Sequence, residues 1–201
     1  MIAVIDYDAG NIKSVEKAIV HLGKEAQITR DHEILLSAEK VILPGVGAFG
    51  DAMAKLNEYG LTPVIKSIVK KGTPFLGICL GLQLLFDSSE ESPGVDGLGV
   101  LPGKILRFPS TEGYKVPQIG WNSLSFPKEK RLFKGIPEDS YVYFVHSYYL
   151  KADERNDVAA QSDYILTFDA AVERDNVFAC QFHPEKSSDV GLKILKNFID
   201  L

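Results

Sequence analysis

Residues 73–86 have the sequence TPFLGICLGLQLLF: an apolar strand, a cysteine between two glycines, and the start of a helix. The G-x-C-x-G spacing is typical of a nucleophile elbow, a sharp strand-to-helix turn that holds up a reactive side chain. Gly77 and Gly81 suit such a turn because side chains there would collide with nearby backbone. The turn would place the Cys79 sulfur at a helix N-terminus, which favours thiolate. The structural alternative is a small buried core residue.

The segments before this turn predict a parallel sheet. Short apolar runs without polar alternation alternate with helical patterns, which is typical of strands covered by helices on both faces. The expected strands are 2–6, 25–29, 40–45 and 73–78, and the expected helices are 12–22, 51–58, 63–71 and one that starts at residue 80. Asn11 is the expected N-cap of the first helix, and Gly23 its expected C-terminal stop.

The second half of the chain is mostly strand-like. The expected strands are 99–108, 122–126, 141–150, 157–162 and 176–183, and an amphipathic helix is expected over 190–201. No repeat, low-complexity tract or linker divides the chain. We therefore expect one α/β domain, residues 1–201, with an open, mostly parallel mixed sheet flanked by helices and the nucleophile elbow after a central strand.

Composition limits the possible classes of function. The 201 residues are 45% hydrophobic and 24% charged, which is ordinary for a soluble globular chain. A net charge of -5 with scattered basic residues argues against a nucleic-acid partner. No apolar run could span a membrane, and Asp6 comes too early for a secretory signal. Two cysteines cannot form a disulfide framework, so we expect a reducing, cytoplasmic location.

A second set of chemical groups lies near the C-terminus, in NVFACQFHPEKSS. Alternation along the strand would place His183 opposite Cys180, at a strand terminus where catalytic groups of open α/β sheets gather. Glu185 would return to the His183 side if the chain stays extended, and its carboxylate would then orient the imidazole. Cys79, His183 and Glu185 would form a nucleophile–base–orienter arrangement.

The other cysteine and histidines favour packing over chemistry. Cys180 and His183 point to opposite faces and no further Cys/His pair completes a metal site, so we expect no metal and no cofactor. Cys180 is expected in the core, and His21 and His32 near the surface. His146 has aromatic neighbours and is expected to be a hydrogen-bonded core or interface histidine.

Three motifs together identify a family. PGVGAFG at 44–50, GICLGLQLLF at 77–86 and FHPEKS at 182–187 occur in the order of the class I (triad) glutamine amidotransferases, which the chain resembles over its whole length. The segments DYDAGNIKSV, PQIGWN, YFVHSYY and HPEKSS are similar to the glutaminase subunits of imidazole glycerol phosphate synthases, which act in histidine biosynthesis. The resemblance implies a flavodoxin-like fold. A glutaminase of another ammonia-using synthase, such as pyridoxal phosphate synthase, is the related alternative.

The resemblance also implies a reaction, the hydrolysis of L-glutamine to L-glutamate and ammonia. Cys79 would form a glutamyl thioester, His183 would shuttle protons and Glu185 would orient the imidazole. The implied oxyanion-hole residues are Val46, Gly47 and Leu80. The implied glutamine-binding residues are Gly47, Gln83, Glu91, Ser147 and Tyr148. For Glu91, a solvated acidic loop is the alternative interpretation.

Ammonia released into water is mostly protonated, so a partner that takes it directly is expected. The resemblance implies a heterodimer with a (β/α)8-barrel cyclase subunit, which makes imidazole glycerol phosphate and aminoimidazole carboxamide ribotide. The residues expected at the contact are Asn11, Trp121, Tyr143 and Lys186. For Trp121, a partly buried core position is an equal alternative.

Two further classes of function stay open at this point. One is a non-catalytic interaction subunit on the same fold, which would need a broken triad that the sequence does not show. The other is a cysteine peptidase or another hydrolase on a similar scaffold.

Overall fold

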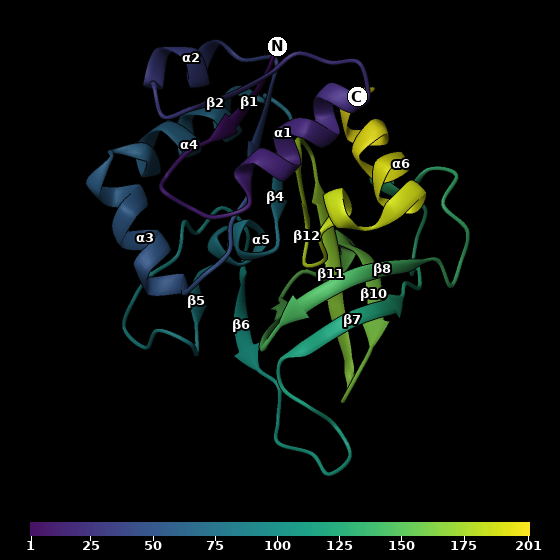
Figure 1. The fold of residues 1–201 in the computed structure, drawn as a ribbon. Helices are drawn as coiled ribbons and strands as arrows, with labels where there is room; N and C mark the ends of the chain where they lie inside the picture. The colour runs from purple at the N-terminus through teal and green to yellow at the C-terminus, as the bar shows by residue number, and fades with distance from the viewer.

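The computed structural model describes residues 1–201 (Figure 1). The strands are β1 (Ile2–Ile5), β2 (Ala26–Thr29), β3 (Lys40–Leu43), β4 (Phe75–Ile78), β5 (Ser88–Ser89), β6 (Gly103–Arg107), β7 (Gln118–Ser123), β8 (Tyr141–His146), β9 (Tyr148–Ala152), β10 (Val158–Asp163), β11 (Thr167–Arg174) and β12 (Val177–Cys180). The α-helices are α1 (Ile12–His21), α2 (His32–Ser37), α3 (Phe49–Glu58), α4 (Leu61–Lys71), α5 (Leu80–Leu84) and α6 (Ser188–Ile199). The 3-10 turns are η1 (Arg131–Phe133), η2 (Arg155–Asp157) and η3 (Pro184–Lys186).

A ten-stranded mixed sheet forms the centre of the molecule. Its order is β2-β1-β3-β4-β12-β11-β9-β6-β5, with β10 paired to β11, while β7 and β8 form a separate two-stranded sheet. Five neighbouring strands, β2, β1, β3, β4 and β12, run parallel to one another, and β12 pairs antiparallel with β11. The open, mostly parallel mixed sheet predicted from the sequence is therefore confirmed, with β4 between β3 and β12.

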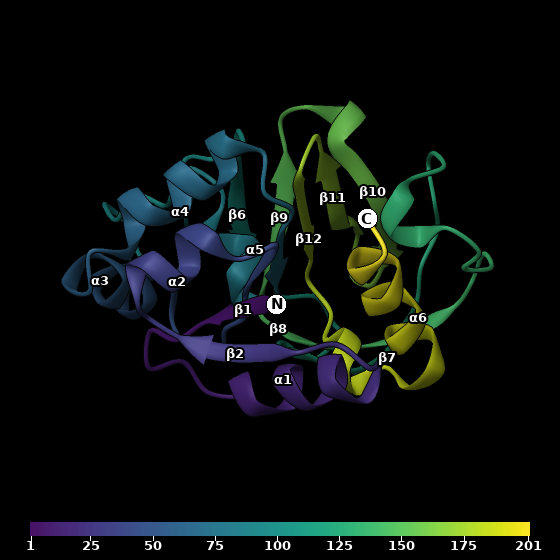
Figure 2. The same ribbon diagram turned by 90° about the horizontal axis from the view of Figure 1, so that it is seen from above.

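Helices cover both faces of the parallel strands. Helices α1 and α6 lie on one face, and α2, α3 and α4 lie on the other (Figures 1 and 2). Within β1, Ala3 and Ile5 join one hydrophobic core, whereas Ile2 and Val4 join the other. Both faces are apolar because both are covered, which explains the continuous hydrophobic runs in the sequence. No helix is long and apolar enough to cross a lipid bilayer.

Some elements differ from those that the sequence predicts. The stretch 141–150 is two strands rather than one: β8 pairs with β7, whereas β9 pairs with β6 and β11. The strand predicted at 122–126 lies at 118–123, so Trp121 belongs to β7. The predictions also omit α2 and β11. Strand periodicity is the same on both sides of Ser147, so it cannot reveal that the chain changes sheets there.

Candidate active site

Cys79 occupies the bend between β4 and α5, at the carboxyl end of a central strand. Its backbone has φ 55° and ψ -109°, which non-glycine residues rarely adopt. A Cβ added to Gly81 would lie 1.8 Å from the Leu43 carbonyl oxygen, and one added to Gly77 would lie 2.7 Å from the Gly81 oxygen. Both glycines therefore permit a close backbone approach, as expected for a nucleophile elbow.

Helix α5 begins at residue 80, as predicted, but contains only five residues, so its dipole at Cys79 is weak. Val46, Gly47 and Leu80 line the pocket at Cys79, as expected for oxyanion-hole residues. However, the Leu80 N–H donates to the Gly45 oxygen over 3.3 Å. An oxyanion can use this N–H only after that hydrogen bond opens.

His183 and Glu185 lie at the same edge of the sheet as Cys79, because β12 runs parallel to β4 beside it. His183 Nδ1 donates to Glu185 Oε1 over 2.8 Å, and both side chains are almost fully buried. The connection is not the extended chain predicted. The 3-10 turn η3 returns Glu185 to His183, because Pro184 begins a turn here in addition to ending the strand.

Electrostatics favours the charged form of His183. Burial lowers the pKa of His183, but the Cys79 sulfur and the Glu185 carboxylate outweigh burial and raise this pKa to about 9. His183 Nε2 is buried and makes no hydrogen bond of ordinary geometry. The Cys79 sulfur is nevertheless close enough to raise the pKa of His183. Nε2 is therefore the nitrogen available to exchange a proton at Cys79.

Hydrogen bonds from distant segments hold the His183 loop. The His183 N–H donates to the Tyr143 oxygen over 3.0 Å, and Ser187 Oγ donates to the His183 oxygen over 2.6 Å. Ser187 Oγ also accepts the Tyr143 N–H over 2.9 Å. Asn11 Nδ2 donates to Glu185 Oε1 over 2.6 Å. Asn11 lies at the N-cap position of α1, but its side chain does not cap the helix as predicted and instead donates to Glu185.

A pocket of about 300 Å³ opens beside Cys79. All the predicted glutamine-binding residues line it, namely Gly47, Gln83, Glu91, Ser147 and Tyr148. Glu91 is not on a freely solvated loop, since its Oε2 accepts the Phe49 N–H over 2.8 Å. Gln83 Nε2 donates to the Tyr148 oxygen over 3.3 Å and to Gln181 Oε1 over 3.0 Å. Both of its N–H groups are used, so Gln83 Oε1 is the atom left to accept from a ligand.

His146 forms part of the pocket wall as a neutral, hydrogen-bonded histidine, in agreement with its predicted role. Burial lowers the pKa of His146 to about 4. Its Nδ1 lies 2.8 Å from the Tyr148 oxygen and carries the proton, because a carbonyl can only accept. Its Nε2 lies 2.9 Å from Gln118 Oε1. Because this nitrogen carries no proton, the contact is a hydrogen bond when the Gln118 amide is turned over, so that its N–H donates to the ring.

Gln181 lies beside the nucleophile but is not among the predicted site residues. Its side chain is fully buried, and Nε2 donates to Cys79 Sγ over 3.8 Å. The sequence contains a signal for it, because Gln181 is a polar residue on the His183 face of an otherwise apolar strand. That pattern does not identify its contact, which is 102 residues away.

The remaining cysteine and histidines lie where the sequence places them. Cys180 is fully buried in the core, and burial raises the pKa of its thiol. His21 is exposed, and His32 Nε2 contacts the Tyr59 oxygen at the surface. No group of three or more His, Cys, Asp and Glu side chains is arranged to hold a metal ion.

Of the side chains predicted at a partner contact, those of Trp121 and Lys186 are exposed and those of Asn11 and Tyr143 are half-buried. Trp121 is 52% exposed and meets Tyr143 edge to face with ring centroids 6.2 Å apart, so it is not a core residue. Ile119 on the same face of β7 is 65% exposed, and Tyr141 on β8 is 58% exposed. Lys186 is exposed next to Glu185. An apolar surface therefore lies on β7 and β8.

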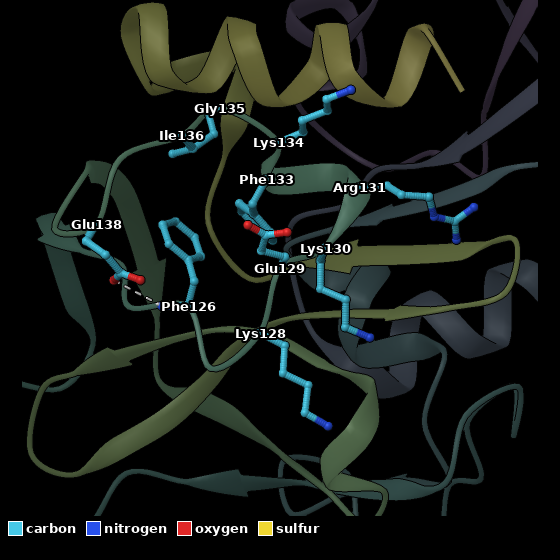
Figure 3. A pocket seen from close by; sticks show the side chains of 10 residues that line it. All are labelled: Phe126, Lys128, Glu129, Lys130, Arg131, Phe133, Lys134, Gly135, Ile136 and Glu138. Atoms are coloured by element: carbon cyan, nitrogen blue, oxygen red, sulfur yellow. Dashed lines mark hydrogen bonds between the residues drawn. The ribbon is translucent and has the colours of Figure 1, made fainter.

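A larger hollow of about 620 Å³ lies in the loop between β7 and β8 (Figure 3). Lys130 and Arg131 extend away from Phe126 rather than converging, and both already bond to Glu173. The hollow contains no nucleophile, and the buried unpaired polar atoms of the chain belong to His183 and Glu185 instead. The smaller pocket at Cys79 is therefore the candidate active site.

Comparisons with known proteins agree with this geometry. The family model described as "Glutamine amidotransferase class-I" matches residues 3–201. Imidazole glycerol phosphate synthase subunit HisH of Desulfitobacterium hafniense is 51% identical over 198 residues, which are 98% of this chain and 93% of that relative. The subunit of the same name from Methanothermobacter thermautotrophicus is 50% identical over 202 residues, covering 100% of this chain and 98% of the relative.

Solved structures share the fold. A crystal structure of a glutamine amidotransferase gives a TM-score of 0.78 at 22% identity and covers 100% of this chain and 98% of its own. PurLQS from Thermotoga maritima gives a TM-score of 0.77 at 20% identity and covers 99% of this chain and 97% of its own. At these identities the likeness concerns the fold alone.

Proposed function

Because this chain belongs to the class I glutamine amidotransferase family, we propose that Cys79, His183 and Glu185 hydrolyse glutamine at the pocket beside Cys79. The chain is the glutaminase subunit of an imidazole glycerol phosphate synthase and acts in histidine biosynthesis, as the motifs predicted. The observation that supports these residue roles is the 2.8 Å bond from His183 Nδ1 to Glu185 Oε1, next to a cysteine held at φ 55°.

The reaction has two steps in this proposal. The Cys79 thiolate attacks the side-chain amide carbon of glutamine, and the C–N bond breaks as His183 Nε2 gives its proton to the leaving ammonia. Water then attacks the glutamyl thioester while His183 takes a proton from it, which releases glutamate and restores the thiolate. Glu185 orients the ring and stabilises the imidazolium. The Leu80 N–H and the Val46–Gly47 backbone stabilise both oxyanions once the bond to Gly45 has opened.

The pocket chemistry suits a free amino acid with an amide side chain. Glu91 supplies a carboxylate for the substrate α-ammonium, and Gln83 Oε1 accepts an N–H from the ligand. Gly47, Ser147 and Tyr148 complete the pocket wall. These assignments rest on the lining residues and on the hydrogen bonds that already occupy Gln83 Nε2.

The relatives are named as subunits, so this chain works with a partner subunit. In our proposal the partner is a (β/α)8-barrel cyclase that uses the ammonia to form imidazole glycerol phosphate and aminoimidazole carboxamide ribotide. Asn11, Trp121, Tyr143 and Lys186 contribute to the contact. Residues 1–201 act as a single amidotransferase domain, in the cytoplasm.

The catalytic proposal is tested with Cys79→Ala in the complex with the partner subunit. We expect glutamine hydrolysis to fall by more than about 10³-fold while partner binding survives. A glutamine-analogue alkylator should label Cys79 and not Cys180 in the wild type. Retained hydrolysis in Cys79→Ala would overturn the proposal. An unreactive Cys79 would favour a non-catalytic subunit, and peptide turnover without glutamine turnover would select a peptidase.

The contact surface is tested separately by titration calorimetry with the cyclase subunit. Trp121→Ala should weaken binding by about tenfold or more, because exposed aromatic residues often anchor interfaces. Val20→Ala is the matched control, since Val20 is 56% exposed on α1. Equal affinities for the two variants would remove Trp121 from the contact.

A further inference from the structure

One buried side chain at the active site has no role in the reaction described above. This inference rests on the proposed function, in which Cys79 is the nucleophile. We propose that Gln181 is a further catalytic residue, whose side-chain N–H donates to the Cys79 sulfur and stabilises the attacking thiolate. The two atoms, Gln181 Nε2 and Cys79 Sγ, lie 3.8 Å apart, and the Gln181 side chain is fully buried.

The surrounding hydrogen bonds fix the orientation of the Gln181 amide. Gln83 Nε2 donates to Gln181 Oε1 over 3.0 Å and to the Tyr148 oxygen over 3.3 Å. If the Gln181 amide were turned over, its nitrogen would face the Gln83 nitrogen and its oxygen would face the thiolate. Both contacts would be repulsive, so the network selects the orientation in which an N–H points to sulfur.

The other ionisable side chains near Cys79 donate their hydrogen bonds to other acceptors or lose their proton during the reaction. The Tyr7 hydroxyl donates to the Pro44 oxygen over 2.9 Å, and Cys180 Sγ donates to the Phe182 oxygen over 3.5 Å. His183 must give up its proton during each turnover. Gln181 does not ionise, so its N–H stays with the sulfur in every protonation state of the site.

Burial strengthens the hydrogen bond from Gln181 to the Cys79 sulfur. A hydrogen bond to a charged acceptor is strong where water is excluded, and Gln181 has no exposed surface. Helix α5, with five residues, supplies only a weak dipole to the same sulfur. Gln181 is not among the residues that line the glutamine pocket. Gln83 keeps its bond to the Tyr148 oxygen without Gln181, so the loss of Gln181 should lower kcat and leave KM nearly unchanged.

The test compares wild type with Gln181→Leu and Gln181→Met, which replace the amide by an apolar side chain of similar size and so remove both the donor to Cys79 and the acceptor of Gln83 Nε2. The pH dependence of iodoacetamide alkylation is followed at the Cys79 peptide by mass spectrometry, and thermal unfolding verifies folding. We expect the alkylation midpoint to rise by about one pH unit. In the complex with the partner subunit, kcat near pH 7 should fall about tenfold with KM within about twofold.

Gln161→Leu is the matched control, since this glutamine bonds to Asp169 and not to Cys79. It should keep the wild-type alkylation midpoint. A wild-type midpoint in either folded Gln181 variant would overturn the role of Gln181 while the proposed function stands. If wild-type Cys79 resists alkylation and Cys79→Ala still hydrolyses glutamine, the proposed function fails and this inference fails with it.

Discussion

The turns that follow β4 and β12 are neighbours at one edge of the sheet, but they hold the proposed catalytic groups by different means. The turn after β4 is defined by backbone contacts, because Gly77 and Gly81 leave no room for a side chain. The turn after β12 is held by hydrogen bonds from other segments to His183, Glu185 and Ser187. The position of the proposed nucleophile, Cys79, thus requires glycines without side chains beside it, whereas the position of the proposed base, His183, requires polar partners.

The largest effect expected from this difference is on Gly81→Ala. The new Cβ would lie 1.8 Å from the Leu43 oxygen, so the sheet or the elbow must shift. We expect the free energy of unfolding to fall by about 3 kcal/mol or more in urea titrations. Gly94→Ala is the control: its Cβ would meet nothing within 4 Å, and its φ of 83° costs only about 1 kcal/mol. Equal losses would show that packing at the elbow is not the constraint.

The next largest effect is expected for Glu185→Gln, which changes a polar group in the turn after β12. The amide has nearly the same shape as the carboxylate but cannot stabilise the imidazolium in the same way, so kcat for glutamine should fall about 10²-fold or more. The measurement uses the complex with the partner subunit. Glu112→Gln, at an exposed site, provides the charge control. If Glu185→Gln keeps the wild-type kcat, the backbone of η3 alone positions His183.

A smaller effect is expected for Ser187→Ala. This variant removes the hydroxyl that bonds to the His183 oxygen and leaves the Tyr143 N–H without its acceptor. We expect about 1–3 kcal/mol less stability by urea unfolding, and a lower kcat, because the His183 loop loosens. Ser110→Ala, which changes an exposed serine, should change neither quantity. A loss of stability without a loss of kcat would show that the Ser187 hydrogen bonds stabilise the loop but do not position His183 for catalysis.

The smallest effect is a pH dependence of stability. The pKa of His183 is raised from 6.5 to about 9 in the folded chain, so protonated His183 stabilises the fold fully below pH 6.5. This contribution is lost as the pH rises through about 9. Cys79→Ala removes one cause of the raised pKa, so its stability should fall less steeply, by about 1 kcal/mol across the window. Superimposable curves for wild type and variant, from urea titrations at several pH values, would contradict the effect of Cys79 on the pKa of His183.

The two turns also differ in how well the sequence predicts them. The elbow is visible because glycine spacing directly reflects a local backbone requirement, and Cys79 lies where the pattern predicts. At the second turn the sequence shows the proposed catalytic residue types but not the backbone path after Pro184, since a proline can end a strand or begin a 3-10 turn. The bonds of Asn11 and Ser187 join segments far apart in sequence, which no local pattern can reveal.

The same distinction explains the errors in the fold. The central parallel strands β1, β4 and β12 are predicted because each is continuously apolar, whereas α2 is missed because its six residues are too few for a periodic pattern. The one sequence signal for α2 is Asp31, a residue type favoured at N-caps. In the structure its side chain accepts the N–H groups of Glu33 and Ile34. The change of sheet at Ser147 is invisible because it depends on tertiary pairing, which strand periodicity does not encode.

The position of β12 between β4 and β11 has a consequence for synthesis of the chain. Cys79 is synthesised early, but the strand that leads to His183 pairs with β4 from 102 residues further along, as the contact between Cys79 and Gln181 shows. A ribosome-bound chain that stops before residue 177 contains Cys79 but lacks His183, and its β4 has an unpaired edge open to aggregation. With the proposed triad, ammonia production therefore cannot begin until β12 and η3 have been synthesised and β12 has inserted beside β4.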